Sequence, residues 1–528
     1  MPAFVSAREA VNLIPDNAFV LFGGSGGGHA IAETVIEALA ERYEDSSSPS
    51  GLTLSSVVSL GDWESTGFNR LAKPGLIKRV ITAGLNNCPK LAALAEDDAI
   101  EAYVWPQGVL SQLCRDSSAG RPGILTNVGL HSFVDPRYEG GRQSPRTSED
   151  LVRHIEIAGD EYLFYPALPV DVAVIRGTTA DERGNITMED EAVYGEMFSM
   201  AAAARRRGGI VICQVKRVAQ AGTLPGKQVK VPAPLVDYVV VDPNQKQTYQ
   251  IAFDPSYAGA LRAPAGAIGR IPFDIRKCMA RRAAMELRPA DVVNLGFGVS
   301  NGISSVAVEE GILSDITLTV EQGVFGGAPA GGKDAGAGVN FDAMIDQPYQ
   351  FDFYDGGGLD IAFLSFAQVD ERGNVNVSKF GTTVAGPGGF INISQGTRRV
   401  VFSGSLTAKG LRVEPDGAGG VRVTQEGSVM KWVKKVDQIT FNGQQALKRG
   451  QEVTFVTDRA VFELTPEGPV CVEIAHGVDL DKDVRPQIGF DFGIAENLNR
   501  MDERIFRDEP MAFAEEFRRR TPRRRSIS

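Results

Sequence analysis

The chain contains the stretch Asp171-Val172-Ala173-Val174-Ile175, followed by Asp181-Glu182-Arg183-Gly184-Asn185-Ile186, and it repeats this pattern once, which indicates how the molecule is built. Asp360-Ile361-Ala362-Phe363-Leu364 and Asp370-Glu371-Arg372-Gly373-Asn374-Val375 form the second copy. The two parts of the match share one offset, since 360 − 171 and 370 − 181 both equal 189. A shared offset of this kind indicates that the chain contains a duplicated domain.

The same offset carries the apolar run 210–213 (IVIC) onto 399–402 (RVVF). Each Asp-Glu-Arg-Gly-Asn is predicted to be a structural turn between two strands, in which Asp and Asn bond their own backbone and Gly takes a positive φ. The boundary between the halves is placed between Phe253 and Asp274, where proline, glycine and alanine accumulate. We therefore expect halves at 1–255 and 275–515, a linker at 256–274 and a basic tail at 516–528.

Each half opens with an apolar strand, a glycine-rich turn and an amphipathic helix. Alternation of such units with further apolar runs predicts two homologous α/β domains with largely parallel sheets, whose ligands lie at the carboxyl ends of the strands. The units are 18–22, 23–28 and 31–42 in the first half, and 292–295, 296–302 and a helix from about 303 in the second.

The composition is that of an ordinary globular protein, with 43% hydrophobic and 23% charged residues over 528 positions. A net charge of −11 argues against nucleic-acid and anionic-membrane partners. The basic block 518–525 is interpreted as a solvated end of the chain. The start, 1–9, has no signal-peptide pattern and no later stretch is long and apolar enough to span a membrane, so a cytoplasmic location is expected.

Several catalytic classes lack their motifs. The five scattered cysteines predict neither a disulfide framework nor a zinc site, and no metal site is expected. The first glycine turn contains no G-x-G-x-x-G, so a dehydrogenase is disfavoured, and no P-loop or G-x-S-x-G occurs. Of the four histidines only His29 is placed near a site, and a role in starting the helix is an equal alternative.

One carboxylate stands at a position suited to chemistry. Glu321 ends an apolar run and is followed by a long glycine-rich turn, 323–332. Glycines allow backbone amides to approach a ligand closely. A glutamate placed there can attack an electrophile while neighbouring amides receive the developing negative charge, as acyl transfer through a covalent glutamyl intermediate requires.

The segment E-x-G-x-x-G-G-x-P-A-G-G at 321–332 resembles the active-site motif of the family I CoA-transferases, in the branch of acetate and propionate CoA-transferases. The similarity extends from near Phe19 to about Phe506. It includes 104–109 (VWPQGV), 119–123 (AGRPG), 176–181 (RGTTAD), 351–358 (FDFYDGGG) and 388–392 (GGFIN).

The resemblance implies roles for particular residues. Glu321 would be the nucleophile, Gln107 a side-chain donor to the oxyanion, and the Gly388-Gly389 segment a backbone donor. The CoA moiety would lie along the amides of Gly296, Phe297, Gly298, Val299 and Ser300, while the first half would supply the acyl-side wall, with Gly26, Gly27, Gly28 and His29. Leu125–His131 is expected to occupy the position that corresponds to Glu321 in the first half, so one active site per chain follows.

The expected activity is reversible transfer of CoA from a short-chain acyl-CoA to a free carboxylate such as acetate or propionate. CoA is then a substrate, no cofactor is needed, and a homo-oligomer, dimer or tetramer, is implied by the resemblance. Family members often have proline in place of His29-Ala30 and Ser300-Asn301, which leaves the acyl group open. The alternatives are a succinyl-CoA:3-oxoacid CoA-transferase of ketone body metabolism, a thioester hydrolase and a non-catalytic CoA-ester binding protein.

Overall fold

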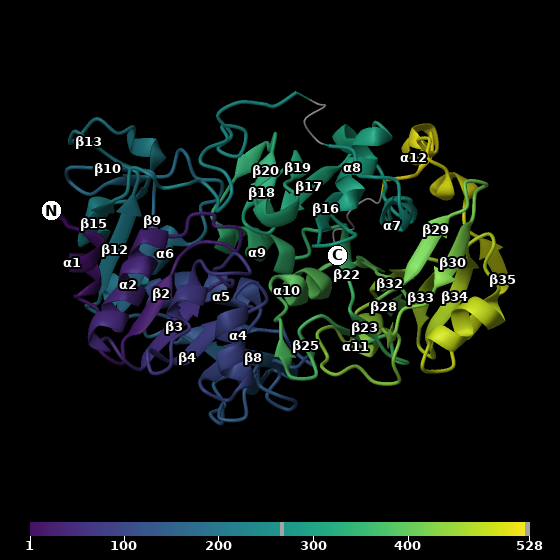
Figure 1. The fold of residues 1–528 in the computed structure, drawn as a ribbon, viewed down its shortest axis with the longest axis horizontal. Coiled ribbons are helices and arrows are strands. Elements are labelled where there is room, and N and C mark those ends of the chain that lie inside the picture. The colour runs from purple at the N-terminus through teal and green to yellow at the C-terminus, as the bar shows by residue number, and fades with distance from the viewer. Residues whose placement is uncertain (265–268, 523–528) are drawn as a thin grey trace.

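The computed structural model describes residues 1–264 and 269–522, and its framework is two large β-sheets with helices packed on them (Figure 1). The N-terminal half, purple to teal in the figure, lies beside the C-terminal half, teal-green to yellow. Both sheets are built mainly from parallel strands that read in the sequence as short apolar runs, the pattern of strands buried on both faces.

The sheet of the N-terminal half has eight strands, and all neighbouring strands in it are parallel. In spatial order they are β1 (Ala3–Phe4), β15 (Tyr238–Val241), β12 (Ile210–Val215), β9 (Val172–Arg176), β2 (Phe19–Phe22), β3 (Leu52–Ser56), β4 (Ile77–Thr82) and β5 (Glu101–Val104).

The sheet of the C-terminal half has ten strands, with a parallel centre and antiparallel pairs toward both sides. In spatial order they are β21 (Ala343–Met344), β18 (Val324–Phe325), β17 (Thr317–Val320), β16 (Val292–Leu295), β22 (Ile361–Ser365), β27 (Arg399–Ser403), β32 (Glu452–Val456), β33 (Ala460–Thr465), β34 (Gly468–Ile474) and β35 (Gly493–Arg500).

The strand orders confirm the prediction of two homologous α/β halves. The run β15-β12-β9-β2-β3 in the first sheet matches β32-β27-β22-β16-β17 in the second, and the repeated segments form the equivalent strands β9 and β22. The matching corrects one expectation. Because β3 is equivalent to β17, the position that corresponds to Glu321 follows β3 at Val57, whereas Leu125–His131 begins in a separate small sheet.

The two Asp-Glu-Arg-Gly-Asn segments are turns of the same construction. The Asp181 carboxylate accepts hydrogen bonds from the amides of Arg183 and Asn185 and from the Asn185 side chain. The Asp370 carboxylate accepts the equivalent three hydrogen bonds, from the amides of Arg372 and Asn374 and from the Asn374 side chain. Both turn glycines take positive φ, 94° and 72°, as predicted.

Helices cover both sheets. They are α1 (Ala7–Val11), α2 (Glu33–Ser46), α3 (Phe68–Leu71), α4 (Pro89–Glu96), α5 (Gln107–Ser118), α6 (Met197–Arg206), α7 (Ile275–Ala284), α8 (Gly302–Glu309), α9 (Gln347–Asp355), α10 (Phe390–Gly396), α11 (Gly443–Lys448) and α12 (Ala514–Arg519).

Local sequence explains where several helices begin and end. The Asp274 side chain caps α7 by accepting a hydrogen bond from the Lys277 amide. Helix α2 begins at Glu33, later than the expected Ile31, because the N-cap residue Ala32 has a ψ of 65°, outside the helical region. It ends at Ser46 because Ser47 adopts the left-handed conformation.

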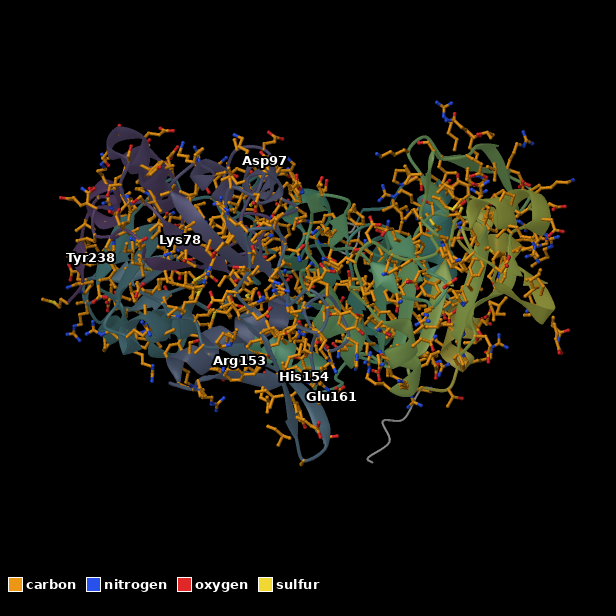
Figure 2. The ribbon with its side chains drawn as sticks, turned by 90° about the horizontal axis from the view of Figure 1, so that it is seen from below. Lys78, Asp97, Arg153, His154, Glu161 and Tyr238 are labelled. Carbon is orange, nitrogen blue, oxygen red and sulfur yellow. The ribbon has the colours of Figure 1, made fainter. Side chains whose placement is uncertain are left out.

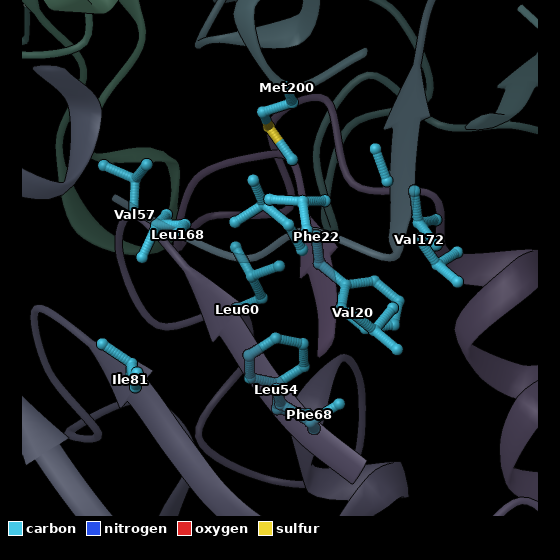
Figure 3. Close-up of a cluster of buried hydrophobic side chains, with 14 of the residues drawn as sticks. Val20, Phe22, Leu54, Val57, Leu60, Phe68, Ile81, Leu168, Val172 and Met200 are labelled. Carbon is cyan, nitrogen blue, oxygen red and sulfur yellow. The ribbon is translucent and has the colours of Figure 1, made fainter. Parts of the chain in front are cut away.

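Each half has its own hydrophobic core. In the first, Val20 and Phe22 of β2, Leu54 of β3 and Val172 of β9 are buried with Phe68 and Met200 from the covering helices (Figure 3). The core of the second half is rich in aromatic side chains, and Trp432 contacts Phe366, Phe455 and Phe462 there. Burial of these apolar surfaces is the main force that stabilises each half.

Small sheets lie outside the two large ones. A three-stranded antiparallel sheet projects from the first half, and its hairpin bears His154 and Glu161, whose side chains bond at 3.0 Å (Figure 2). It is formed by β6 (Gly123–Thr126), β7 (Arg153–Ile157) and β8 (Asp160–Pro166).

The other small strands are β10 (Thr179–Asp181), β11 (Ile186–Thr187), β13 (Arg217–Ala219), β14 (Val229–Val231), β19 (Ala328–Pro329), β20 (Gly338–Val339), β23 (Gln368–Val369), β24 (Val375–Asn376), β25 (Lys379–Phe380), β26 (Thr383–Val384), β28 (Thr407–Ala408), β29 (Arg412–Pro415), β30 (Val421–Gln425) and β31 (Val429–Met430).

The first part of the expected basic tail forms a helix. Helix α12 includes Arg518 and Arg519, and it anchors the segment through Phe517, which is fully buried against the second half. Arg518 pairs with Asp315 at 2.9 Å, but the Arg518 and Arg519 side chains are both exposed, as expected for a solvated basic segment. The tail beyond 522 and positions 265–268 of the linker lie outside the described residues, and the domain limits stay a prediction.

Candidate active site

A cavity of about 500 Å³ lies between the two halves. Its walls come from the carboxyl ends of the central strands of both sheets, where α/β proteins bind ligands. The first half contributes Ser25, Gly26 and Gly27 after β2 and Val58 and Ser59 after β3. The second contributes 294–298 around the end of β16, and 320–322 at the end of β17.

Glu321 follows β17 directly, and its carboxyl group enters this cavity. Burial raises the pKa of Glu321 to about 7, and hydrogen bonding from Gln322 and Gln107 opposes the rise. Gln322 Nε2 donates to Glu321 Oε1 at 3.3 Å. A raised pKa marks a carboxylate that is poorly solvated when ionised, and therefore more reactive as a nucleophile than one in water.

Gln107 begins α5 and is fully buried beside Glu321, in the wall of the cavity. Among the described residues neither its Oε1 nor its Nε2 meets a hydrogen-bond partner of standard geometry. Buried amides are normally satisfied. An unsatisfied amide that faces a cavity is available to a ligand, which is what an oxyanion donor requires.

The Gly388-Gly389 segment lies on the same side of the cavity. The Gly388 amide donates to Ala83 O at 2.9 Å, and Gly388 O accepts a hydrogen bond from the backbone N–H of Gln107 at 3.1 Å. Within the described chain no partner is found for the Gly389 amide, which precedes α10. A Cβ added to Gly389 would lie 2.7 Å from Glu321 Oε2, so glycine leaves the space that the carboxyl group fills. Of the two predicted amide donors, only Gly389 remains available.

The first glycine turn divides into a part that lines the cavity and a part that does not. Gly26 and Gly27 line it, and Asn87 supports them by donating to Gly26 O at 3.4 Å. Gly28 lies behind the wall, where a Cβ would meet Tyr249 N at 2.4 Å. Its glycine therefore serves the close packing of Tyr249.

His29 is fully buried and does not line the cavity. Its Nε2 lies 3.2 Å from Ala335 O, in the glycine-rich loop 323–336 of the other half. Burial lowers the pKa of His29 to about 4, so the ring is neutral near pH 7. His29 thus connects the two halves behind Gly27. It does not line the cavity, where it was predicted to contact the substrate.

The segment predicted to hold CoA is placed at the cavity only in part. Gly296, Phe297 and Gly298 line it, and Val299 lines a neighbouring cavity of about 590 Å³ that shares Gly298. The Gly296 amide already donates to Phe363 O at 2.7 Å. The amides of 297–300 have no partner in the parts of the chain that the structure describes, although Ser300 itself is buried.

Sequence reasoning missed several polar residues at the site. Gln322, which follows the nucleophile, also donates to Ser25 Oγ at 3.4 Å. Asn294 lines the cavity and donates to Tyr354 OH at 3.3 Å. Lys333 lies at the mouth, paired with Glu64 at 3.3 Å. Of these residues, only Gln322 could have been found from the sequence, because it is adjacent to Glu321. The others reach the site through tertiary packing.

Two broad features bear on other classes of function. Among residues 1–264 and 269–522, no group of three or more His, Cys, Asp or Glu side chains is arranged to hold a metal ion. Over the same ranges no helix is long and apolar enough to cross a membrane.

Comparison with known proteins places the chain in a family. The coenzyme A transferase family model matches residues 4–242. The chain is 44% identical to the caffeate CoA-transferase of Acetobacterium woodii, over 96% of this chain and 98% of that one. It is 43% identical to the acetate CoA-transferase YdiF of Escherichia coli K12, over 96% of each.

The structural comparison agrees. The crystal structure of the acyl-CoA transferase YdiF from E. coli O157:H7, a thioester complex with CoA, superposes with a TM-score of 0.93 at 43% identity, covering 97% of both chains. Identity at this level over the whole length fixes both fold and reaction class. The protein belongs to the coenzyme A transferase family and is a CoA-transferase.

Proposed function

We propose that the enzyme transfers CoA reversibly from a short-chain acyl-CoA to a free monocarboxylic acid, with Glu321 as the covalent nucleophile. The observation that carries the proposal is the placement of the Glu321 carboxyl group in the cavity between the halves, beside the unsatisfied Gln107 amide. A raised pKa for Glu321 supports the same role. The relatives named for caffeate and acetate CoA-transfer are consistent with this class of substrate.

The proposed reaction has two symmetrical halves. Glu321 attacks the thioester carbonyl, CoA thiolate leaves, and a mixed anhydride forms. The thiolate then attacks the glutamyl carbonyl, which releases the first acid and leaves a glutamyl-CoA thioester. An acceptor carboxylate resolves that thioester by the reverse of these steps. Holding the reactants together lowers the barrier through proximity.

Each step passes through a tetrahedral state with negative charge on oxygen. The Gln107 side chain and the Gly389 amide flank the Glu321 carboxyl group and are free to donate to that oxygen. An oxyanion donor contributes roughly 3 kcal/mol in other acyl transferases. The 297–300 amides are proposed to bind the CoA moiety.

The charges around the cavity favour a neutral acyl group over a succinyl group. Of the described residues that line the cavity, only Glu321 and Lys333 are ionisable, and Lys333 is paired with Glu64 at the mouth. A second carboxylate on the substrate, buried beside Glu321, would find no cation there other than Lys333 among the described lining residues. Burial of an unpaired charge is strongly unfavourable, so the succinyl-CoA:3-oxoacid alternative is the weaker one.

Trapping at Glu321 tests the mechanism. After incubation with acetyl-CoA, borohydride or hydroxylamine should modify Glu321 and inactivate the enzyme, and mass spectrometry locates the modification. Glu321→Ala is expected to lower exchange by more than about 10³-fold, as loss of a covalent nucleophile does. Near-normal exchange by Glu321→Ala would refute the mechanism.

A donor and acceptor panel tests the substrate class. Acetyl-, propionyl- and butyryl-CoA are expected to donate to acetate or propionate at least about 10²-fold faster than succinyl-CoA, because a buried unpaired carboxylate costs several kcal/mol. Acyl-CoA consumption should require the acceptor. Equal loss without acceptor identifies a hydrolase, and binding without any exchange identifies a CoA-ester binding protein.

A further inference from the structure

Gln322 occupies a position between the nucleophile and the other half of the molecule. It is 6% exposed, lines the cavity, and follows Glu321 immediately. Its Nε2 carries two hydrogens, and the structure gives each a partner: Glu321 Oε1 at 3.3 Å and Ser25 Oγ at 3.4 Å. Ser25 belongs to the glycine turn after β2, so the link joins the two sheets across the cavity.

The two oxygens of Glu321 therefore have different surroundings. Oε1 receives the Gln322 hydrogen bond, whereas Oε2 is the atom nearest to Gly389, where a Cβ would approach to 2.7 Å. The Gly389 backbone, whose amide has no partner among the described residues, therefore lies on this second side. Oε1 is thus held by Gln322, whereas Oε2 faces the Gly388-Gly389 segment.

Packing holds the Gln322 side chain in place. A Cβ added to Gly336, in the glycine-rich loop, would lie 3.4 Å from Gln322 Cδ and 3.3 Å from His29 Cδ2. His29 in turn contacts Ala335 O of the same loop. The amide is thereby confined between the loop and the glycine turn. Hydrogen bonds of 3.3 to 3.4 Å are long, as is common before substrate closes a site.

From this geometry we infer that Gln322 is a positioning residue: it holds Oε1 of Glu321, leaves Oε2 as the attacking oxygen, and couples that orientation to Ser25 of the other half. Gln322 touches neither the thioester nor CoA in this assignment and acts through Glu321. The inference rests on the CoA-transfer mechanism proposed above.

The variant Gln322→Met tests the assignment, because methionine keeps the length and volume and removes both N–H groups. A hydrogen bond to a carboxylate stabilises its ionised form, so its loss raises the pKa of Glu321 further. We expect kcat to fall about 10-fold, the low end for hydrogen bonds to charged groups, with KM for acetyl-CoA within about twofold. The acid limb of the pH–rate profile should move to higher pH.

A second readout does not depend on turnover. Carbodiimide reacts with protonated carboxyl groups, so labelling of Glu321, measured by peptide mass spectrometry, falls as pH rises through its pKa. The midpoint should lie at higher pH in Gln322→Met than in the natural protein. An unchanged midpoint and an unchanged acid limb would overturn the inference. If the natural enzyme shows no exchange, the proposed function fails while the labelling still tests Gln322.

Two further variants separate positioning from general support. Gln395→Met removes another amide that joins the halves, through Asn127 O and the Gly129 amide at 2.8 Å each, but Gln395 does not line the cavity. It should lower Tm without moving the acid limb. Ser25→Ala combined with Gln322→Met should lose no more activity than Gln322→Met alone, since Ser25 acts through Gln322. Additive losses would refute the coupling to Ser25.

Discussion

At Glu321, burial makes the carboxyl group harder to ionise and its ionised form more reactive. Burial is the largest influence on its pKa, which is raised from 4.5 to about 7. Only the ionised form attacks a thioester. Below the raised pKa of Glu321, most of the enzyme therefore carries an inactive, protonated glutamic acid.

The first prediction at the residue scale concerns pH. The fraction of ionised Glu321 rises as pH increases through its pKa, so kcat/KM for acetyl-CoA in the free enzyme should fall about tenfold per unit below an acid limb near pH 7. Initial rates between pH 5 and 9 measure this. A limb near pH 4.5, the ordinary value for glutamate, would contradict the burial argument.

The second prediction concerns Gln107. Its side-chain amide makes no hydrogen bond of standard geometry among the described residues and only a weaker interaction with Glu321, so Gln107→Leu should leave Tm nearly unchanged. Exchange should fall about 10²- to 10³-fold, the usual cost of losing an oxyanion donor. Comparison of Tm with kcat checks both parts. A large drop in Tm with proportionate activity loss would assign Gln107 a structural role.

At the scale of elements, the site is assembled where chain segments begin or end. Glu321 follows β17, Gln107 begins α5, and Gly389 immediately precedes α10. Strand and helix ends are held by the elements they belong to, which positions side chains more firmly than a free loop would. Substitutions at such ends are expected to affect activity more than stability.

Gly389→Ala tests that expectation. Gly389 has a φ of −78°, which alanine adopts without strain, so the backbone and Tm should change little. The added methyl group would lie 2.7 Å from Glu321 Oε2 and must displace the carboxyl group. A displacement near 1 Å costs about 10²-fold in rate, which initial rates of exchange would reveal. Near-normal exchange would show that Glu321 tolerates the move.

At the scale of the whole molecule, polar contacts fix how the halves meet. Asn392 of α10 accepts a hydrogen bond from the Gly108 amide at 3.0 Å and donates to Asp355 at 2.9 Å. Asp355 also accepts from Gln112 of α5 at 2.9 Å. Burial raises the pKa of Asp355 to about 6, which these donors oppose. The network ties the start of α5, and so Gln107, to the second half.

Asn392→Ala is expected to loosen this connection. It leaves the buried Gly108 amide without its acceptor and takes one donor from Asp355, which should cost about 1 to 3 kcal/mol in free energy of unfolding. Because Gln107 is adjacent, kcat should fall as well. Chemical denaturation and exchange rates measure the two effects. Gln395→Met is the matched control on the same helix, expected to affect stability with less effect on kcat.

Particular elements show how much could be predicted. Short apolar runs such as 18–22 and 292–295 predicted β2 and β16 closely, because strands buried on both faces are predominantly apolar. The Asp-Glu-Arg-Gly-Asn turns were predicted because their bonds lie within five residues. Leu125–His131 was placed incorrectly, since strand order in a sheet depends on contacts between residues distant in sequence.

The duplication, the α/β class, the turns and the location of Glu321 at a strand end could be predicted from the sequence, because they depend on local pattern and on repetition along the chain. Three features depend on how the halves pack and could not be predicted: the Gly388 amide is hydrogen-bonded, His29 lies behind the cavity wall, and Gln322 reaches Ser25. The physical reason is that hydrogen-bond partners and solvent exclusion are set by segments hundreds of positions apart, which meet only when the two halves pack together.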